Sequence, residues 1–524
     1  MKINRYSMHS FTHFHLVGIK GTGMTALAGY LLKKGKIVSG SDTEEKFFTD
    51  AVLERLGIKF AEGFNAKNIP SGTEILIHST AFSAKTNPEI RFALEKGIKV
   101  STYPEALAEF FNQARGVAVA GSHGKTTTSA LLANTLTDLG FSPSAIIGSK
   151  VLNWQSNSLS GESDLFVIEA DEHQNKLRFY EPQSIILNNI DYDHPDFYRT
   201  VEAYVTAFAD FVKCWAKRDN QTGFLVTNQD DVYCRQIIKN LVRSDQIVTF
   251  GKGKRADFCL KKIVTKLDKN NLFRSRITLK IKIKGDFLPL PQKNGLFVKF
   301  DSPLAGEHNA GNATAVLAFV FRLILQLRQS QKADVLEPKE ELKKWFSSSL
   351  PATATQQKVW LKRLVRIIEQ SLLTFLGTER RLQFKGKIKK TLVFDDFAHH
   401  PSEIVATLKA VKGSLPRYRL IVLFQPHTFS RTEKFLSEFA NSFERADQIG
   451  ILKIYASARE SEGSVSAEDL ADLISEKEKV VYFENREAAV KHFSQLNFNR
   501  PTVFLTLGAG DGFRVGEELI LRNE

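Results

Sequence analysis

The chain has few cysteines. It carries three, Cys214, Cys234 and Cys259, in 524 residues, and none of them forms a Cys-x-x-Cys pair. Three separated thiols make neither a disulfide framework nor a cysteine-based metal site. This scarcity argues against a disulfide-stabilised secreted domain and favours a reducing cytoplasm.

Long apolar runs are also scarce. The N-terminal segment before residue 13 lacks the apolar core of a signal peptide, so we expect no export. The most apolar predicted helix, 313–327, is interrupted by Arg322 and is expected to be too short to span a bilayer. The composition is 43% hydrophobic and 25% charged, as in globular proteins, and the length predicts roughly two to four domains.

Basic residues outnumber acidic residues, 72 to 58, which gives a formal net charge of +14. Basic runs at 252–255 and 385–390 are compatible with nucleic-acid binding. The excess is nevertheless spread along the chain and also suits small substrates that carry phosphates. We therefore expect no specific nucleic-acid partner.

The stretch 116–128, GVAVAGSHGKTTT, predicts a phosphate-binding turn. The apolar run 116–120, typical of a buried parallel strand, precedes the turn, and leucines at helical spacing predict a helix over 126–139 that Gly140 ends. Backbone N–H groups of such a turn, at a helix N-terminus, bind anions. Val119 stands where the full pattern has glycine, and an ordinary strand–turn–helix is the alternative. The predicted nucleotide-binding residues are Gly121, Ser122, His123, Gly124, Lys125, Thr126 and Thr127.

A second strand, glycine turn and helix occupy 14–35. The spacing of Gly18, Gly21 and Gly23 is G-x-x-G-x-G rather than G-x-G-x-x-G, which argues against NAD and for another phosphate-bearing ligand. Ser41 and Asp42 follow the next strand, about where a Rossmann-like fold meets a ribose or sugar nucleotide. A turn that serves packing alone is the alternative.

Two later apolar segments end in acidic residues. They lead into EADE at 169–172 and into NNIDYDH at 188–194. Ligands of parallel sheets bind at the carboxyl ends of strands, so we expect these groups to face the triphosphate and hold Mg²⁺. The predicted metal ligands are Thr126, Glu169 and His194, and solvated acidic loops are the alternative.

Residues 251–300 alternate apolar and basic side chains and predict exposed antiparallel strands or an inserted hairpin. Residues 328–366 predict a helix plus a mobile segment around 347–357. Asn309 and Asn312 stand near the start of the apolar helix and are compatible with helix caps. We assign no chemical role to residues 251–300 or 328–366.

From about residue 375 onward, strand after strand ends in polar residues. His399, His400 and His427 all follow such strands, and helical segments separate them. This pattern predicts a doubly wound α/β domain whose strand ends form one functional edge. We expect these histidines to contact ligands rather than to serve the core.

The ordered motifs resemble those of the Mur ligases of bacterial peptidoglycan synthesis. They are HLVGIKGTGM, SGSD, GSHGKTTT, EADE, NNIDYDH, GEHNAGNATA, GTERRLQ, DDFAHHP, FQPHTFSRT, IYASARE and LGAGD, and they cover nearly the whole chain. The resemblance implies an α/β protein of three domains. These are a Rossmann-like UDP-binding domain over 1–113, a central P-loop ATPase-type domain over 114–374 and a doubly wound Rossmann-like domain over 375–524.

The resemblance is closest to the branch that joins L-alanine to UDP-N-acetylmuramate. It implies that the muramic acid carboxylate takes the γ-phosphoryl group of ATP and that the amino group then displaces phosphate. It also implies ATP and Mg²⁺ as cofactors. We expect a cytoplasmic monomer or weak homodimer without membrane insertion.

Residue roles carry over by position. Gly18, Gly21, Thr22, Gly23, Ser41 and Asp42 would approach the uridine diphosphate. Lys125 and Thr126 would hold the γ-phosphate and Mg²⁺, with Glu169 and His194 serving the metals. Asn309 would meet the adenine, and Arg381 and Asp396 would reach the nucleotide. His399, His427 and Arg431 would position the amino acid and the transferred phosphate. The predicted catalytic set is Lys125, Glu169, His194, His399, His427 and Arg431.

Several positions depart from this pattern. Lys20 stands where the first glycine turn usually has glycine. DDFAHH and NNIDYDH lean toward the murein-peptide ligases, which attach a tripeptide to the same sugar nucleotide, whereas FQPH, YASAR and GAGD lean toward the L-alanine branch. Segment 204–213 offers no equivalent of the carbamylated lysine of other members. The alternative function from a different class is a non-catalytic nucleotide-binding protein. The presence of Lys125, Thr126, Glu169 and His194 argues against it.

Overall fold

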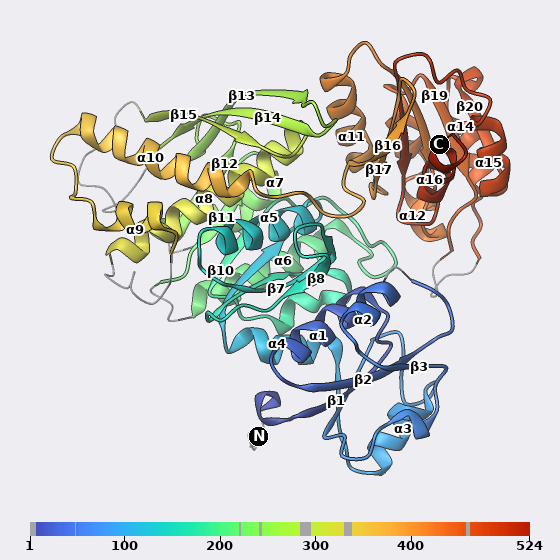
Figure 1. Cartoon of the computed structure of the whole chain (residues 1–524), viewed down its shortest axis with the longest axis horizontal. Coiled ribbons are helices and arrows are strands. Elements are labelled where there is room, and N and C mark those ends of the chain that lie inside the picture. Colours follow the sequence, from blue (N-terminus) through green and yellow to red (C-terminus); the bar gives the residue numbers. More distant parts are fainter. Residues whose placement is uncertain are drawn as a thin grey trace.

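Three separate sheets follow one another along the chain in the computed structural model. It describes residues 7–47, 49–218, 222–239, 241, 244–282, 295–329, 338–456 and 462–523. Figure 1 shows the N-terminal domain in blue below, the central domain in teal to yellow, and the C-terminal domain in orange and red at the upper right. The predicted class, α/β with three domains, is confirmed.

The N-terminal sheet has five parallel strands in the order β3-β2-β1-β4-β5. The strands are β1 (His13–Val17), β2 (Ile37–Asp42), β3 (Phe60–Glu62), β4 (Ile75–His78) and β5 (Lys99–Thr102). The helices are α1 (Thr22–Lys33), α2 (Asp50–Arg55), α3 (Pro88–Glu95) and α4 (Tyr103–Asn112). Because β1 is central and parallel to its neighbours, the glycine turn after it lies at the carboxyl edge of the sheet.

The central sheet has ten strands in the order β15-β14-β13-β12-β11-β10-β6-β9-β7-β8. The strands are β6 (Arg115–Ala120), β7 (Ser144–Val151), β8 (Ser156–Leu159), β9 (Leu165–Glu169), β10 (Ser184–Leu187), β11 (Leu225–Asn228), β12 (Ile247–Gly251), β13 (Phe258–Leu267), β14 (Phe273–Ile281) and β15 (Leu296–Ser302). The helices are α5 (Lys125–Asp138), α6 (Val201–Lys217), α7 (Val232–Lys239), α8 (Gly306–Gln329), α9 (Glu340–Ser347) and α10 (Ala354–Leu372). β6 lies between β9 and β10 and is parallel to both, so the ends of these three strands meet at one edge.

Strands β13 to β15 continue the central sheet as antiparallel strands, as the alternating pattern predicts. They are not exposed on both faces, however. Ile277, Leu279 and Ile281 are fully buried in the domain core, so the prediction of exposed strands is wrong for that face. Residues 283–294 of this predicted segment lie outside the described residues.

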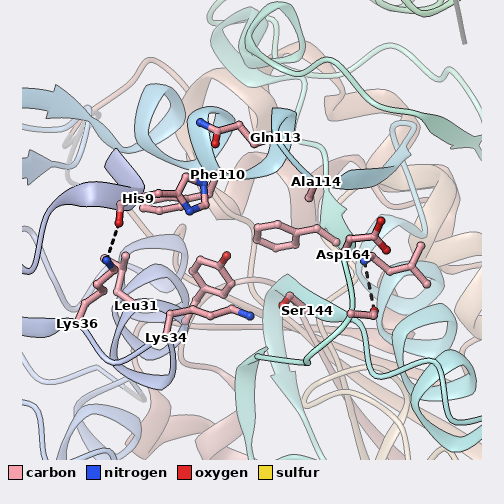
Figure 2. A pocket seen from close by; sticks show the side chains of 13 residues that line it. His9, Leu31, Lys34, Lys36, Phe110, Gln113, Ala114, Ser144 and Asp164 are labelled. Carbon is pink, nitrogen blue, oxygen red and sulfur yellow. Dashed lines mark hydrogen bonds between the residues drawn. The ribbon is translucent and has the colours of Figure 1, made fainter. Parts of the chain in front are cut away.

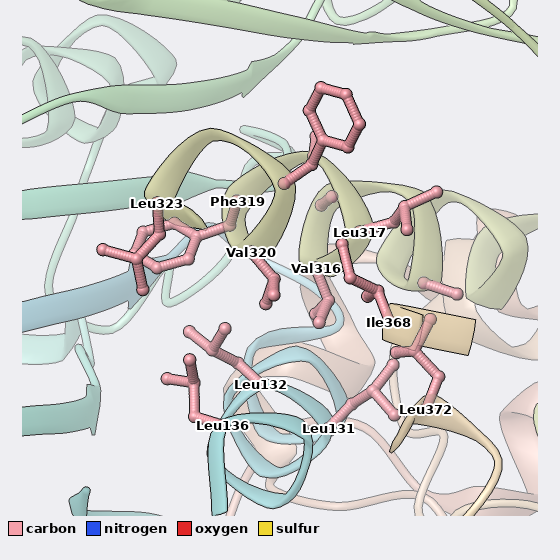
Figure 3. Packing of buried hydrophobic residues seen from close by; sticks show 14 of the residues in the cluster. Leu131, Leu132, Leu136, Val316, Leu317, Phe319, Val320, Leu323, Ile368 and Leu372 are labelled. Atoms are coloured by element: carbon pink, nitrogen blue, oxygen red, sulfur yellow. The ribbon is translucent and has the colours of Figure 1, made fainter. Parts of the chain in front are cut away.

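Helix α8 forms the centre of the central domain's core. Leu131, Leu132 and Leu136 of α5 pack with Val316 and Val320 of α8, and α10 closes the cluster with Ile368 and Leu372 (Figure 3). Trp345 of α9 stacks on Trp360 of α10 at a centroid distance of 4.0 Å. Residues 338–366 are thus largely helical and packed, while 330–337 lie outside the described part of the chain.

The predicted length of this apolar helix is wrong. α8 begins at Gly306 and has 24 residues, so by length and composition it is the one described helix that could cross a membrane. Of its most apolar 18-residue window, 83% is buried, which identifies it as a core helix. Asn309 and Asn312 consequently lie within its first turns rather than at a cap.

The C-terminal sheet has the order β16-β17-β21-β18-β19-β20, with β16 antiparallel and the other strands parallel. The strands are β16 (Gln383–Ile388), β17 (Thr391–Asp396), β18 (Arg419–Phe424), β19 (Gln448–Leu452), β20 (Val480–Phe483) and β21 (Thr502–Leu507). The helices are α11 (Pro401–Ser414), α12 (Phe429–Lys434), α13 (Leu436–Ala440), α14 (Ala467–Leu473), α15 (Arg486–Phe493) and α16 (Phe513–Leu521). The ends of β17, β18 and β21 face the central domain; residues 457–460 of the IYASARE motif are not among the described residues.

Candidate active site

The turn between β6 and α5 has a backbone that requires glycine at two positions. Gly121 has φ +134° and Gly124 has φ +78°. A Cβ atom at Gly121 would lie 2.9 Å from the Asn189 carbonyl oxygen, and one at Gly124 would lie 2.7 Å from Asn312 Oδ1. Because α5 begins directly at Lys125, the turn presents the free N–H groups of a helix N-terminus.

The Lys125 ammonium is folded back over this turn. Its Nζ donates to the carbonyl oxygens of Gly121 at 2.6 Å and Ser122 at 3.0 Å, and lies 2.8 Å from Glu172 Oε2. Burial alone would lower the pKa of Lys125, but the nearby carboxylates of Glu172 and Asp171 raise it. The lysine therefore keeps its charge at neutral pH.

Carboxylates at the end of β9 lie beside the turn. Glu169 Oε1 accepts a hydrogen bond from Thr126 Oγ1 at 2.9 Å, and Glu169 Oε2 accepts one from the Gly148 N–H at 2.7 Å. Burial raises the pKa of Glu169. His194 Nε2 lies 3.6 Å from Glu172 Oε1, and ligand atoms of Asp171, Glu172 and His194 all lie within 4.8 Å of one another. This oxygen-rich donor set suits a hard divalent cation.

His123 joins the phosphate turn to the C-terminal domain. Its Nε2 lies 3.0 Å from Asp191 Oδ2 and its Nδ1 lies 3.3 Å from Glu403 Oε1 of α11. Burial lowers the pKa of His123, yet the hydrogen bonds to Asp191 and Glu403 outweigh it and raise the pKa to about 10. The Ser402 hydroxyl also donates to Asp191 Oδ2 at 2.6 Å, so both domains share this charged cluster.

The turn before β16 carries two arginines. Arg380 Nε donates to Asp395 Oδ2 at 2.8 Å, while Arg381 lines the central cavity. Asp396 accepts backbone hydrogen bonds from Leu382 at 2.7 Å and Ala398 at 2.8 Å. Burial raises the pKa of Asp396 to about 6. Asp396 thus fixes the backbone on both sides of the strand end.

Arg431 makes an ion pair across the domain boundary. Its Nη2 lies 3.1 Å from Asp193 Oδ1 of the central domain, and both side chains are buried. The His427 ring lies beside it, with Nδ1 3.5 Å from Arg431 Nη1, and the His399 ring centroid is 6.1 Å from that of His427. These groups form a second interdomain cluster next to the phosphate turn.

One cavity of about 670 Å³ collects residues from all three domains. Of the residues predicted from sequence, it is lined by Thr22, Ser122, His123, Gly124, Lys125, Thr126, Glu169, His194, Arg381 and His399. Lys46 and Phe47 reach it from the N-terminal domain, and Tyr455 and Asp511 reach it from the C-terminal domain. The structure therefore brings the phosphate turn, the candidate metal ligands and C-terminal side chains into one space.

Other predicted residues lie beside this cavity without lining it. Gly121 and Thr127 belong to the turn and to the buried face of α5, and Asp396, His427 and Arg431 support the C-terminal wall. Gly18, Gly21 and Gly23 form the first glycine turn, where Gly18 has φ +84° and its N–H donates to the Ser41 carbonyl at 2.8 Å. Ser41 donates to Glu89 at 2.6 Å, and Asp42 accepts from the Lys20 N–H at 2.6 Å, so both side chains already have protein partners.

A second cavity, of about 430 Å³, adjoins the phosphate turn at Gly124. Asn188, Phe250, Lys252 and Asn312 line it. Asn309 does not line this cavity; its Oδ1 accepts a hydrogen bond from Asn312 Nδ2 at 3.0 Å, and it lines a third cavity beside Arg381. Asn309 thus orients Asn312, and its predicted role at adenine stays a prediction.

Sequence reasoning missed several residues of this site. Glu172 and Asp193 belong to the EADE and NNIDYDH motifs, but the sequence does not show that they are buried against Lys125 and Arg431. Glu403 follows the histidine motif by one helical turn, and no sequence pattern marks it. Tyr204 lies in the segment 204–213, which has no equivalent of the carbamylated lysine; its Oη lies 2.7 Å from Ser122 Oγ and donates to Glu172 Oε1 at 3.1 Å.

Comparisons with known proteins agree with this arrangement. Three family descriptions match in order: "Mur ligase family, catalytic domain" over 13–115, "Mur ligase middle domain" over 119–320 and "Mur ligase, glutamate ligase domain" over 380–510. The UDP-N-acetylmuramate–L-alanine ligase of Desulfitobacterium hafniense is 33% identical over 510 residues, with 97% of this chain and 99% of the relative covered. The enzyme of the same name from Treponema pallidum is 33% identical, with 96% and 95% covered.

Solved structures show the same fold. The UDP-N-acetylmuramate–alanine ligase of Thermotoga maritima matches with a TM-score of 0.71 at 23% identity, covering 98% of this chain and 99% of that one. A murein peptide ligase from Psychrobacter arcticus matches with a TM-score of 0.62 at 21% identity, covering 98% of each chain.

Proposed function

Since this chain belongs to the Mur ligase family, we propose that it joins L-alanine to the carboxylate of UDP-N-acetylmuramate at the expense of ATP. The reaction would take place in the cytoplasm during the synthesis of peptidoglycan precursors. The observation that carries the proposal is the cavity in which the phosphate turn, the acidic cluster and side chains of the C-terminal domain meet. The named relatives, which match over nearly their full length, support L-alanine over a tripeptide.

The phosphate turn would bind the triphosphate. In the first step, an oxygen of the muramic acid carboxylate bonds to the γ-phosphorus while the bond to the β-phosphate oxygen breaks and ADP leaves. Lys125 would exchange its contact with Glu172 for the transferred phosphoryl group, and Arg381 would add positive charge from the opposite wall. Positioning and charge are the main contributions that such a transfer needs.

Thr126, Glu169 and His194 fit a Mg²⁺ ion, and Glu172 and Asp171 lie close enough to contribute. The fit rests on the donor chemistry of the site: a hydroxyl, three carboxylates and an imidazole beside the phosphate turn. When bound, Mg²⁺ would neutralise charge on the phosphate oxygens.

The adjoining cavity would hold the adenine. Gly124 of the phosphate turn lines it, so the cavity lies next to the place where the phosphates would bind. Asn312 and Asn188 offer amide donors and acceptors there, and Phe250 offers an apolar wall. Asn309 would act through Asn312.

The second step needs a positioned amine. The nitrogen of L-alanine bonds to the acyl carbon, the bond from this carbon to the phosphate oxygen breaks, and the proton that the amine loses ends on the departing phosphate. His399 and His427 stay neutral at pH 7 because burial and then Arg431 lower their pKa values to about 3 and about 4. Arg431 would share its guanidinium between Asp193 and the carboxylate of the amino acid.

A competition experiment tests the nucleophile. The protein receives ATP, Mg²⁺, UDP-N-acetylmuramate, and equal concentrations of L-alanine and L-Ala-γ-D-Glu-diaminopimelate, and mass spectrometry identifies the products. We expect UDP-N-acetylmuramoyl-L-alanine to dominate. A dominant tripeptide product would instead identify a murein-peptide ligase, and no product with either amine would favour a non-catalytic nucleotide-binding protein.

A further inference from the structure

A separate cavity of about 430 Å³ lies between the N-terminal and central domains (Figure 2). Leu31, Lys34 and Phe110 reach it from the N-terminal domain, and Ser144 and Asp164 reach it from the central domain. Ala114, in the link between the two domains, also lines it. A molecule in this space would therefore touch both domains and the connection between them.

This cavity is distinct from the candidate active site. It lies at the starts of the central strands, beside Ser144 of β7 and Leu165 of β9. The phosphate turn and Glu169 lie at the opposite ends of β6 and β9. Since β9 has five residues, its two ends are roughly 13 Å apart.

The walls of the cavity are aromatic. Tyr30 and Phe166 are stacked with a centroid distance of 5.0 Å, and the ring of Phe110 meets Tyr30 edge-on at 5.7 Å. All three residues are buried, with exposed fractions of 2% to 6%, and each has atoms that line the cavity. The edge of a planar aromatic ligand packs well against such rings.

The rim of the cavity is cationic. Lys34 Nζ donates to the Gly161 carbonyl at 2.8 Å, and Lys36 Nζ donates to the His9 carbonyl at 2.7 Å. An ammonium group has three donors, so each lysine keeps donors for a ligand. Asp164 is the one acidic side chain among the lining residues, and Arg115 lies 3.6 Å from its carboxylate. The local charge balance therefore favours an anion.

We propose that this cavity is a binding site for a small aromatic anion, a planar ring system that carries a carboxylate or a similar group. The ring would lie in the cavity against the edges of Tyr30, Phe110 and Phe166, and its charge would meet Lys34 and Lys36. Helix α1 connects this site to the first glycine turn, because the helix starts at Thr22 beside the turn and ends next to Lys34. A bound anion would hold α1 against the central domain.

The test uses 1-naphthoate as the aromatic anion and 1-naphthalenemethanol as its neutral counterpart. Isothermal titration, without ATP or sugar nucleotide, compares the wild-type chain with the Lys34→Gln/Lys36→Gln variant. Lys33→Gln is the matched control, since Lys33 is exposed on the same helix and does not line the cavity. Thermal unfolding checks that each variant is folded.

We expect 1-naphthoate to bind with one equivalent per chain and the double variant to lose roughly tenfold in affinity. Lys33→Gln should bind as the wild type does, and the neutral compound should bind roughly tenfold more weakly. Gln113→Trp, which places a large ring in the cavity, should abolish binding in a folded protein. Absence of binding, equal binding of both compounds, or unchanged binding by the double variant would overturn the proposal. The measurement needs no turnover, so its outcome is independent of the ligase function.

Discussion

The two glycine turns are built alike and use their lysines differently. Each follows a central parallel strand and precedes a helix, and each contains glycine at positive φ. In the turn after β6, Lys125 lines the central cavity and contacts Glu172. In the turn after β1, the Lys20 side chain is fully buried and points to the loop after β2, where its Nζ donates to the carbonyl oxygens of Thr43 at 2.8 Å and Glu45 at 3.0 Å.

The difference shows that the surroundings of a lysine decide its role. Lys20 also pairs with Asp50 at 3.2 Å and Glu62 at 3.3 Å, so its charge is compensated within the N-terminal domain. It orders the segment 43–47, from which Lys46 and Phe47 reach the central cavity. Lys20 is therefore a positioning residue, whereas Lys125 lines the central cavity, where we propose that it contacts substrate.

Lys125→Ala gives the sharpest contrast and the largest expected effect. Turnover should fall by about a hundredfold or more, because the phosphoryl group loses its fixed positive charge in the transition state. ADP release at saturating substrates measures this loss. Since the substitution leaves Glu172 buried without its cation, Lys125→Ala/Glu172→Gln is the matched variant and should regain stability without regaining activity. Near-wild-type ligation by either variant would remove Lys125 from the mechanism.

Lys20→Met should affect stability instead. We expect a loss of about 2 kcal/mol in the free energy of unfolding, below the usual cost of breaking a fully buried pair because Glu62 is 40% exposed. Turnover at saturating substrates should change little, while the KM for UDP-N-acetylmuramate should rise as segment 43–47 loosens. Urea unfolding and steady-state kinetics measure the two effects. Lys46→Met is the control, because Lys46 contacts the same Glu62 from an exposed position and should leave the urea midpoint nearly unchanged. A large loss of turnover in Lys20→Met without a loss of stability would show that Lys20 acts in the reaction as Lys125 is proposed to do.

Much of this fold could be predicted from sequence because parallel strands are short apolar runs that end in polar residues. The predicted strand 116–120 and helix 126–139 correspond to β6 and α5 within one residue. The start of α8 was placed a few residues too late, because the polar residues Glu307 to Asn312 hide helical turns beside the candidate active site. Side-chain pairing was not predictable either. Lys20 and Lys125 both lie in a glycine turn between a strand and a helix, and Asp193 contacts Arg431, which is 238 positions away in the chain.

The candidate site was predictable as a set of motifs rather than as contacts. Glycines, Lys125 and Glu169 follow from local spacing, since strand, turn and helix are continuous in the chain. The clusters around His123 and Arg431 form only when the C-terminal domain packs on the central domain, so local sequence patterns do not predict them. The site roles assigned from sequence remain predictions that the substitutions here test.

Tyr204→Phe examines one hydrogen-bonded support of the second turn. The Tyr204 hydroxyl links Ser122 Oγ of the turn to Glu172, the partner of Lys125, and the residue is fully buried. Removing it should cost about 1.5 kcal/mol of stability, because a charged acceptor loses a donor. Turnover should fall roughly fivefold as Lys125 and Glu172 lose their fixed geometry. Tyr192→Phe is the control, since its hydroxyl donates to the Tyr198 carbonyl rather than to the turn or to Glu172. Equal kinetics for both variants would limit Tyr204 to a structural role.

A pH dependence of stability is expected for the interface beside the second turn. His399 and His427 have pKa values lowered to about 3 and about 4 by burial and then by Arg431, so the unfolded chain binds more protons than the folded chain below pH 6.5. Their contribution to stability is present above pH 6.5 and is lost as the pH falls toward 4. The loss should be about 1 kcal/mol per pH unit for each histidine, somewhat below the full linkage value because the His399 side chain is 19% exposed.

The opposite sign applies to His123, whose pKa is raised to about 10, so its contribution to stability is present below pH 6.5 and is lost as the pH rises through 10. Urea unfolding at pH 7, 6 and 5 should show a slope that His399→Gln reduces and His123→Gln does not. If the free energy of unfolding falls equally with pH in the His399→Gln/His427→Gln variant, other groups cause the pH dependence and it does not belong to the interface beside the second turn.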